Sequence, residues 1–252
     1  MIFYEIYYFL KLNIYYIIIL YMSDKINNWY DKIDKKFVKK HELDRNYKEH
    51  FINPTSHVLC LGGTSAGKTN ALMEFIKRKE GAFYEIIIFT GSTSDEPIYN
   101  FLKAKIPEIQ IYTDINELPN LNDFSDDTND QEKLIVFDDF TDLKPKEMSK
   151  IKEYLKAGRK KGFSCWNLAQ NYVSVNKNIS RNCQYFIIFK LNDSISLNNI
   201  IRNHNVDNID KETFINAYQI ATKEPRNFLM IDTTTGAGIK SLRHNFKSFF
   251  HR

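Results

Sequence analysis

The chain has 252 residues, 43% of them hydrophobic, and a formal net charge of +4 at pH 7. A chain of this size can bury a full core without disulfides or structural metals, which favours one globular α/β domain with short extensions. The small positive charge is compatible with a nucleic-acid partner without requiring one, and the three widely spaced cysteines, Cys60, Cys165 and Cys183, indicate buried reduced thiols rather than a disulfide framework.

Residues 1–21 form an N-terminal extension rich in isoleucine and tyrosine. Its uninterrupted apolar stretch, Ile14 to Met22, is shorter than the ~20 residues that a bilayer span needs, so we expect no stable membrane anchor. It also lacks the positive start and small final residues of a signal peptide. Three interpretations remain: a membrane-associating segment, a packed extra helix, or an upstream in-frame extension with translation starting at Met22. We favour the third, because the abundance of Ile, Tyr, Asn, Lys and Phe suggests an AT-rich genome, in which such extensions arise easily.

Residues 22–55 are predicted to be an N-terminal helical segment, with a helix over 24–50, ahead of a core domain over 56–252. Apolar runs in the core predict strands at 57–61, 83–90, 109–112, 134–137, 164–169, 185–190 and 227–231. Amphipathic spacing predicts helices at 69–79, 97–105, 145–159 and 206–222, and the acidic stretch 114–132 is expected to be a solvated loop. Alternating strands and helices, with strands apolar throughout, indicate an α/β fold with a mainly parallel central sheet flanked by helices.

The run GGTSAGKT, from Gly62 to Thr69, matches the phosphate-binding pattern G-x-x-x-x-G-K-[ST]. Its glycines let successive backbone N–H groups point into one anion-sized hollow, and the following helix adds its positive N-terminal end. A glycine turn with an incidental lysine is the competing interpretation, but an apolar strand before the run and an amphipathic helix after it favour a P-loop. The residues predicted to bind the nucleotide are Gly62, Gly63, Thr64, Ser65, Ala66, Gly67, Lys68, Thr69 and Asn70. Lys68 is expected to meet the β- and γ-phosphates, and the Thr69 hydroxyl to coordinate Mg²⁺.

Two adjacent acids follow the predicted strand 134–137. Mg²⁺ needs a carboxylate opposite the P-loop, usually through water, and Asp138 ends the strand where such a carboxylate must sit. Asp139 can orient and polarise an attacking water, which a small-molecule kinase does not need because its substrate is the acceptor. Adjacent acids at a strand end are otherwise often only a turn, but the upstream P-loop favours the catalytic interpretation.

Gln170 ends the next apolar strand, within SCWNLAQ. A neighbouring parallel strand would place its amide near the γ-phosphate, where it could hold the water and sense hydrolysis. A polar residue at a strand end is the simpler explanation. The guanine-reading pattern N-K-x-D is absent from the sequence, since Asn176-Lys177-Asn178-Ile179 lacks the acid, so ATP is favoured over GTP.

Further motifs follow in order: LIVFDDF, AGRKKGFSCWNLAQNY, NKNISRNCQYFIIFK, and NFLMID followed by SLRHNF. Together with the P-loop, this series resembles the FtsK/HerA superfamily of P-loop ATPases, and within it the poxvirus-type genome-packaging ATPases of large DNA viruses, virophages and related elements. The resemblance covers roughly residues 56–246. It implies a RecA-like core in a homo-oligomeric ring of about five or six subunits, each site completed by an arginine of the next subunit. Arg159 and Arg181 both fit that role; Arg159 is narrowly preferred, and the simpler interpretation of either is a surface cation.

The resemblance implies an ATP-hydrolysing translocase of double-stranded DNA that packages a viral-type genome into capsids, with a capsid or portal-vertex protein as a further partner. It would act in the virion or at assembly sites in the host-cell cytoplasm and would not be secreted. The family's second acid is often Glu, so the shorter Asp139 leaves the geometry of water activation open. The rival interpretations are a related DNA pump or helicase in conjugation or partition, a P-loop small-molecule kinase, and a non-hydrolysing binding module.

Overall fold

The computed structural model describes residues 32–34, 41–91, 97–106, 109–128, 130–204, 209–236 and 238–251. Residues His41–Arg252 form one compact unit. The extension 1–21 and most of the expected helix 24–50 lie outside the described residues, and the proposed domain boundaries stay predictions. Among the described residues, no helix is long and apolar enough to cross a membrane.

One sheet organises the unit, with the strand order β3-β2-β4-β5-β1-β6-β7-β8-β9. The first six strands in this order are parallel: β1 (His57–Leu61), β2 (Glu85–Thr90), β3 (Ile109–Tyr112), β4 (Lys133–Asp138), β5 (Phe163–Ala169) and β6 (Tyr185–Ile188). Three antiparallel strands extend it: β7 (Leu229–Asp232), β8 (Leu242–His244) and β9 (Ser248–Phe249). Every residue of β1 and β5 is buried, as expected for central parallel strands covered on both faces.

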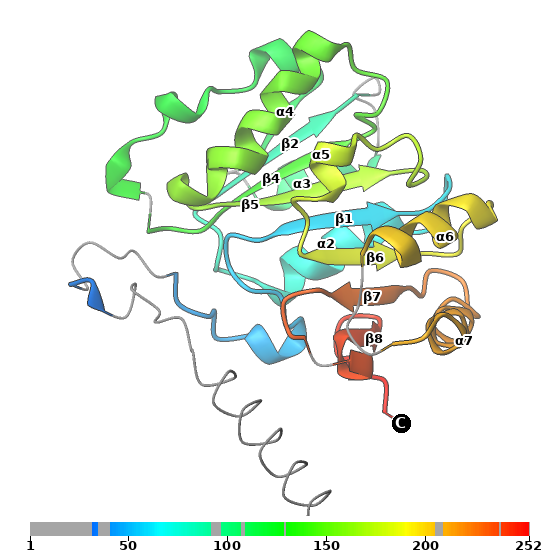
Figure 1. Cartoon of the computed structure of the whole chain (residues 1–252). Helices are drawn as coiled ribbons and strands as arrows, with labels where there is room; N and C mark the ends of the chain where they lie inside the picture. Colours follow the sequence, from blue (N-terminus) through cyan, green and yellow to red (C-terminus); the bar gives the residue numbers. More distant parts are fainter. Residues whose placement is uncertain are drawn as a thin grey trace, which may run out of the picture. The chain divides into compact units, whose positions relative to one another are not determined.

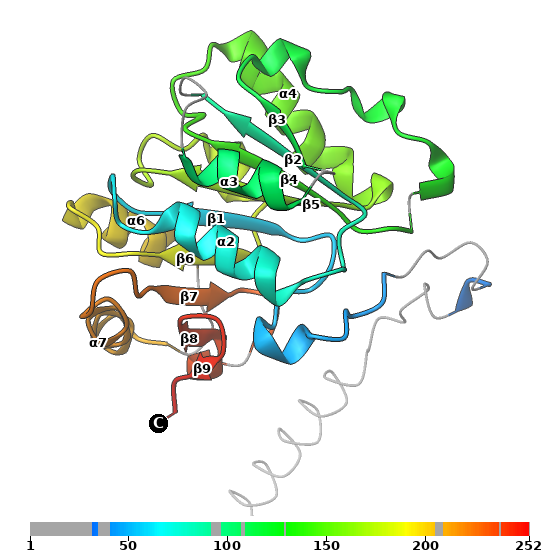
Figure 2. The same ribbon diagram turned by 180° about the vertical axis from the view of Figure 1, so that it is seen from behind.

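Helices cover both faces of the sheet. On one face lie α4 (Pro145–Ala157), α5 (Lys177–Ser180) and α6 (Ser194–Asn203) (Figure 1), and on the other lie α2 (Lys68–Arg78) and α3 (Pro97–Lys105) (Figure 2). α7 (Lys211–Ala221) lies beside β7 and β8 (Figure 1). Each face has its own buried core, with Phe75 of α2 stacked on Trp166 in one and Tyr154 of α4 in the other. Short 3₁₀ helices occur at Tyr47–Glu49, Ile115–Glu117, Leu121–Asp123, Asp126–Thr128, Gly158–Lys161 and Gly238–Ser241.

The predicted mainly parallel sheet is confirmed, and each strand and helix predicted for the core domain is present close to its predicted bounds. The helix expected over 24–50 is wrong for its described end, because residues 41–50 form only turns and the 3₁₀ helix Tyr47–Glu49. The side chain of Asp44 accepts a hydrogen bond from Asn46 N, 2.9 Å away, which favours a turn there over a helix. The helix expected over 206–222 begins at Lys211. The side chain of Asp210 accepts a hydrogen bond from Thr213 N, 2.8 Å away, and so caps the helix at that point. Residues 205–208 lie outside the described part of the chain. α5, α6, β8 and β9 had no counterpart among the predictions. α5 and the two strands are very short, and α6 is rich in Ser and Asn, which favour turns and helix caps over helix interiors.

The acidic stretch 114–132 is more than the solvated loop that its charge predicted. It contains three short 3₁₀ turns, and Ile115, Leu118 and Leu121 are buried in the same core as α4. Tyr154 of α4 donates a hydrogen bond to the carbonyl of Pro119, 2.8 Å away. Apolar residues spaced three apart thus attach this segment to the fold, although the residues between them are polar.

Candidate nucleotide site

The P-loop connects the end of β1 to the start of α2, as its sequence pattern predicts. Gly67 caps α2 with φ of 114°, a conformation that side chains other than glycine rarely adopt. The N–H of Gly62 donates to the carbonyl of Ala169 at the end of β5, 3.2 Å away. Because β5 lies between β1 and β4 and is parallel to both, the carboxyl ends of all three strands lie at the same edge of the sheet as the loop.

The Lys68 ammonium lies over the loop itself. Its Nζ donates to the carbonyl oxygens of Gly62, at 2.8 Å, and Gly63, at 3.2 Å. The loop's own backbone therefore fixes the position of the cation beside the N-terminal end of α2, where the helix dipole adds further positive potential. Together they favour an anion with several charged oxygens.

A cavity of about 510 Å³ opens at this edge of the sheet. It brings together the P-loop, the ends of β4 and β5, and the start of α3. Its lining residues are Thr64, Ser65, Gly67, Lys68, Thr69, Asn70, Pro97, Ile98, Asp138, Asp139, Leu168, Ala169 and Gln170. Five of the side chains singled out from the sequence thus meet in one cavity: Lys68, Thr69, Asp138, Asp139 and Gln170.

A residue that the sequence analysis missed holds one of these acids. The hydroxyl of Tyr99, on α3, donates a hydrogen bond to Oδ2 of Asp138, 2.5 Å away. The Tyr99 side chain is only 2% exposed, so packing of α3 on the sheet fixes where its hydroxyl lies. The two residues are 39 positions apart, and no local pattern in the sequence connects them.

Asp139 has an unusual backbone conformation, with φ of 52°. Such a left-handed conformation costs a residue other than glycine free energy and is often found at functional sites. The turn also depends on Gly91, which follows β2: its N–H donates to the Asp138 carbonyl, 3.0 Å away. A Cβ on Gly91 would collide with the backbone carbonyl of Asp139, so this close approach requires glycine. The neighbouring strand thus determines how Asp139 enters the cavity.

The donor atoms in the cavity suit Mg²⁺. The carboxylate of Asp138 and the hydroxyl of Thr69 both line it, and Mg²⁺ prefers such oxygen ligands together with phosphate oxygens and water. The hydrogen bond from Tyr99 orients the Asp138 carboxylate toward a defined position, as partners of metal-binding carboxylates usually do.

The two candidate arginines lie outside this cavity. Arg159 is in the 3₁₀ helix Gly158–Lys161 just before β5, so it lies at the amino edge of the sheet, opposite the P-loop. Arg181 follows α5 and lines a separate cavity of about 490 Å³ with Lys177 and Arg202. Both arginines are exposed. The structure therefore brings neither of them to the P-loop of their own subunit.

The parallel sheet has a P-loop after β1 and two acids at the carboxyl end of β4, one strand removed from β1. This arrangement defines the chain as having the α/β fold of P-loop ATPases. A family model described as "Poxvirus A32 protein" matches residues 43–240, and the chain belongs to this family. The resemblance drawn from the motifs is thereby confirmed. No curated protein matches the sequence.

Solved structures similar to this chain have the same fold at low sequence identity. The DNA-packaging ATPase B204 from Sulfolobus turreted icosahedral virus matches with a TM-score of 0.54 and 14% identity, over 79% of this chain and 100% of that chain. The genome-packaging NTPase B204 from Sulfolobus turreted icosahedral virus 2, in complex with ATP-gammaS, matches with a TM-score of 0.53 and 16% identity, over 79% and 100% of the two chains. At this identity the likeness establishes the fold.

Proposed function

We propose that this chain is a viral genome-packaging ATPase, which hydrolyses ATP to move double-stranded DNA into a capsid. The observation that carries the proposal is the single cavity in which Lys68, Thr69, Asp138, Asp139 and Gln170 meet. Membership of the poxvirus A32 protein family supports it, as does the fold shared with the packaging ATPase and the packaging NTPase of two Sulfolobus turreted icosahedral viruses.

Each residue in the cavity has a proposed role. The P-loop backbone and Lys68 bind the β- and γ-phosphates, while Thr69 and Asp138 would hold Mg²⁺, which would neutralise charge on the phosphate oxygens. Asp139 accepts a proton from the attacking water, and Gln170 orients that water. Water attack at the γ-phosphorus breaks its bond to the β–γ bridging oxygen and yields ADP and inorganic phosphate.

Assembly into a homo-oligomeric ring is part of the same proposal, because Arg159 and Arg181 lie away from the P-loop of their own chain and could serve only the site of a neighbouring subunit. Arg159 is exposed at the edge of the sheet opposite the P-loop, where it can face the site of the next subunit. Double-stranded DNA and a capsid or portal-vertex protein are the further proposed partners. The proposed place of action is the virion or the assembly site in the host-cell cytoplasm.

ATPase activity with and without double-stranded DNA tests this function. We expect the parent chain to hydrolyse ATP faster when DNA is added. Lys68→Ala should lose ATP binding, because it removes the cation that meets the phosphates. Asp139→Asn should still bind ATP but fail to turn it over, because only water activation is lost. Turnover by Asp139→Asn at the parent rate would contradict the catalytic assignment, and activity indifferent to DNA would contradict the translocase.

A further inference from the structure

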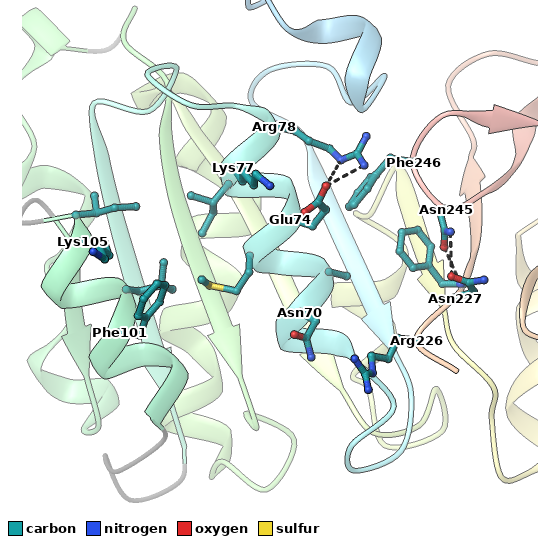
Figure 3. A pocket seen from close by; sticks show the side chains of 16 residues that line it. Asn70, Glu74, Lys77, Arg78, Phe101, Lys105, Arg226, Asn227, Asn245 and Phe246 are labelled. Atoms are coloured by element: carbon teal, nitrogen blue, oxygen red, sulfur yellow. Dashed lines mark hydrogen bonds and ion pairs between the residues drawn. The ribbon is translucent and has the colours of Figure 1, made fainter. Parts of the chain in front are cut away.

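A second cavity, of about 590 Å³, runs along α2 from the P-loop end of that helix (Figure 3). Phe101 of α3 stands on one wall, and Arg226 and Asn227, in the loop before β7, stand on the other. Asn70, the residue after Thr69, lies at the P-loop end. Arg226 also lines a third cavity, of about 480 Å³, together with Thr64 and Ser65 of the P-loop. Arg226 therefore borders the P-loop on the side away from the catalytic acids.

The backbone of Arg226 is in an unfavourable conformation. Glu224 to Asn227 form a turn, closed by a hydrogen bond of 3.2 Å from Asn227 N to the Glu224 carbonyl. Pro225 occupies its second position and Arg226 its third, with φ of 66°. Glycine is the usual residue at the third position of a turn with this conformation. Arginine at this position lowers the free energy of unfolding relative to glycine. Such backbone strain is often found at binding sites.

The turn is held rigidly beside the P-loop. Asn245, at the end of β8, accepts a hydrogen bond from Phe228 N and donates one to the Asn227 side chain, each at 3.1 Å (Figure 3). A Cβ on Gly67 would lie 3.3 Å from both Cβ and Cγ of Arg226. The stem of Arg226 thus packs directly on the glycine that caps α2.

The guanidinium of Arg226 is exposed, and it forms no hydrogen bond or ion pair with any residue that the structure describes. Arg78, further along the same cavity, is by contrast paired with Glu74 at 2.9 Å (Figure 3). Around the P-loop, Arg226 adds to the positive charge of Lys68 and of the α2 N-terminus, so an anion is favoured there. Asp138, Asp139 and Gln170 line only the cavity on the other side of the loop.

These observations extend the nucleotide site proposed above and rest on it. The γ-phosphate belongs beside the catalytic acids, so the other end of the triphosphate must leave the P-loop on the side of Asn70 and Arg226. We propose that Arg226 binds the α-phosphate of the nucleotide within its own subunit. It is a substrate-binding arginine, distinct from the arginine that a neighbour supplies, and it does not contact the phosphoryl group that is transferred.

Arg226→Gly tests the assignment, because glycine suits the backbone conformation and the variant should fold at least as stably as the parent without ligand. The dissociation constants of ATP, ADP and inorganic tripolyphosphate should all rise about tenfold or more, since each places a phosphate at that position. The turnover number at saturating ATP should change less than about threefold. Lys211→Ala, which removes an exposed charge at the start of α7, is the matched control and should bind all three as the parent does.

Several results would overturn the assignment. Unchanged affinities would make Arg226 an ordinary surface residue. Weaker ATP binding with normal ADP binding, or a large loss of turnover with normal affinity, would assign it to the γ-phosphate. Weaker nucleotide binding with normal tripolyphosphate binding would assign it to the base. If the parent chain itself bound no nucleotide, the proposed function would be wrong. If the parent binds and hydrolyses ATP, the results with Arg226→Gly test only the role of Arg226.

Discussion

The hydroxyl of Tyr99 donates a hydrogen bond to the carboxylate of Asp138, 2.5 Å away, across the boundary between α3 and the sheet. This hydrogen bond makes α3 part of the nucleotide site, although α3 contains no recognised motif. The helix also lines the cavity through Pro97 and Ile98. The position of the proposed Mg²⁺ ligand therefore depends on how α3 packs.

Tyr99→Phe should raise the Mg²⁺ concentration needed for half-maximal ATPase activity about tenfold. A hydrogen bond to a charged group contributes ~1.5–3 kcal/mol, and without it the Asp138 carboxylate loses its fixed orientation. ATP binding measured in the presence of a chelator should stay the same. Tyr84→Phe, at an exposed tyrosine before β2, is the control. An unaltered Mg²⁺ dependence in Tyr99→Phe would refute the orienting role.

Gly91→Ala should lower both stability and turnover. The new Cβ would collide with the Asp139 carbonyl, so Asp139 must shift or β2 must move away from β4, at a cost of about 1–3 kcal/mol. Gly236→Ala is the comparison, because Gly236 has φ of 56° and open space around it. Its cost should be about 1 kcal/mol without any change in turnover. Thermal unfolding together with single-turnover hydrolysis separates the two effects; normal hydrolysis by Gly91→Ala would argue against a precise role for Asp139.

Arg159→Ala should bind ATP almost normally and hydrolyse it poorly, since an arginine from a neighbour typically contributes ~10³ to 10⁵ in rate. The seven-residue strand β5 separates Arg159 from Gln170, a span of about 23 Å at 3.3 Å per residue, so Arg159 cannot serve its own site. Mixing Arg159→Ala with Lys68→Ala should restore part of the activity. In a mixed ring, the intact P-loop of one variant faces the intact arginine of the other.

Lys160→Ala removes the exposed neighbouring cation and should leave activity unchanged. Recovery should grow with protein concentration and with added double-stranded DNA, because both favour assembly. Full activity of Arg159→Ala alone, or no recovery despite demonstrated co-assembly, would exclude the trans role. If mixing with Lys68→Ala restored activity to Arg181→Ala but not to Arg159→Ala, the ring model would stand and the trans-acting arginine would be Arg181.

Stability should fall as the pH is lowered from about 6.5 to 4. Burial lowers the pKa of His50, His57 and His204 to about 4 in each case. Because the unfolded chain binds protons at these positions already near pH 6.5, it takes up more protons than the folded chain throughout that window, and each histidine costs up to about 1.4 kcal/mol per pH unit. Thermal unfolding between pH 4 and 8 measures the slope. His57→Gln should reduce it, and His251→Gln, at an exposed position, should not.

The parts of the site that could be predicted from the sequence are those fixed by neighbouring residues. GGTSAGKT determines the loop and the start of α2, because its glycines and the following helix act locally. Asp138 and Gln170 were recognisable because each ends or follows an apolar strand. Tyr99, Gly91 and Arg226 were not, since their roles depend on packing between distant segments. A proline–arginine pair in a turn after a helix was the one local sign of Arg226.

The fold was also predictable only where neighbouring residues determine the structure. Long apolar runs identify the central strands, whereas β8 and β9 are too short to produce a pattern. They are held by long-range contacts instead: the buried Arg243 of β8 donates to the carbonyls of His50, Phe51 and Phe246 and lies 3.5 Å from an oxygen of Asp232. No local sequence pattern in β8 predicts these contacts.

The placement of Arg159 and the P-loop at opposite edges of the sheet gives any assembly built on that contact a direction. In the proposed ring, the Arg159 edge of each subunit would contact the P-loop edge of the next. Such a contact would be heterologous, and all subunits of a closed ring would then have the same orientation. A polymer threaded through the ring would meet all subunits in one orientation. One-way travel along DNA would then need no separate switch, because it would already be encoded in the polarity of the sheet.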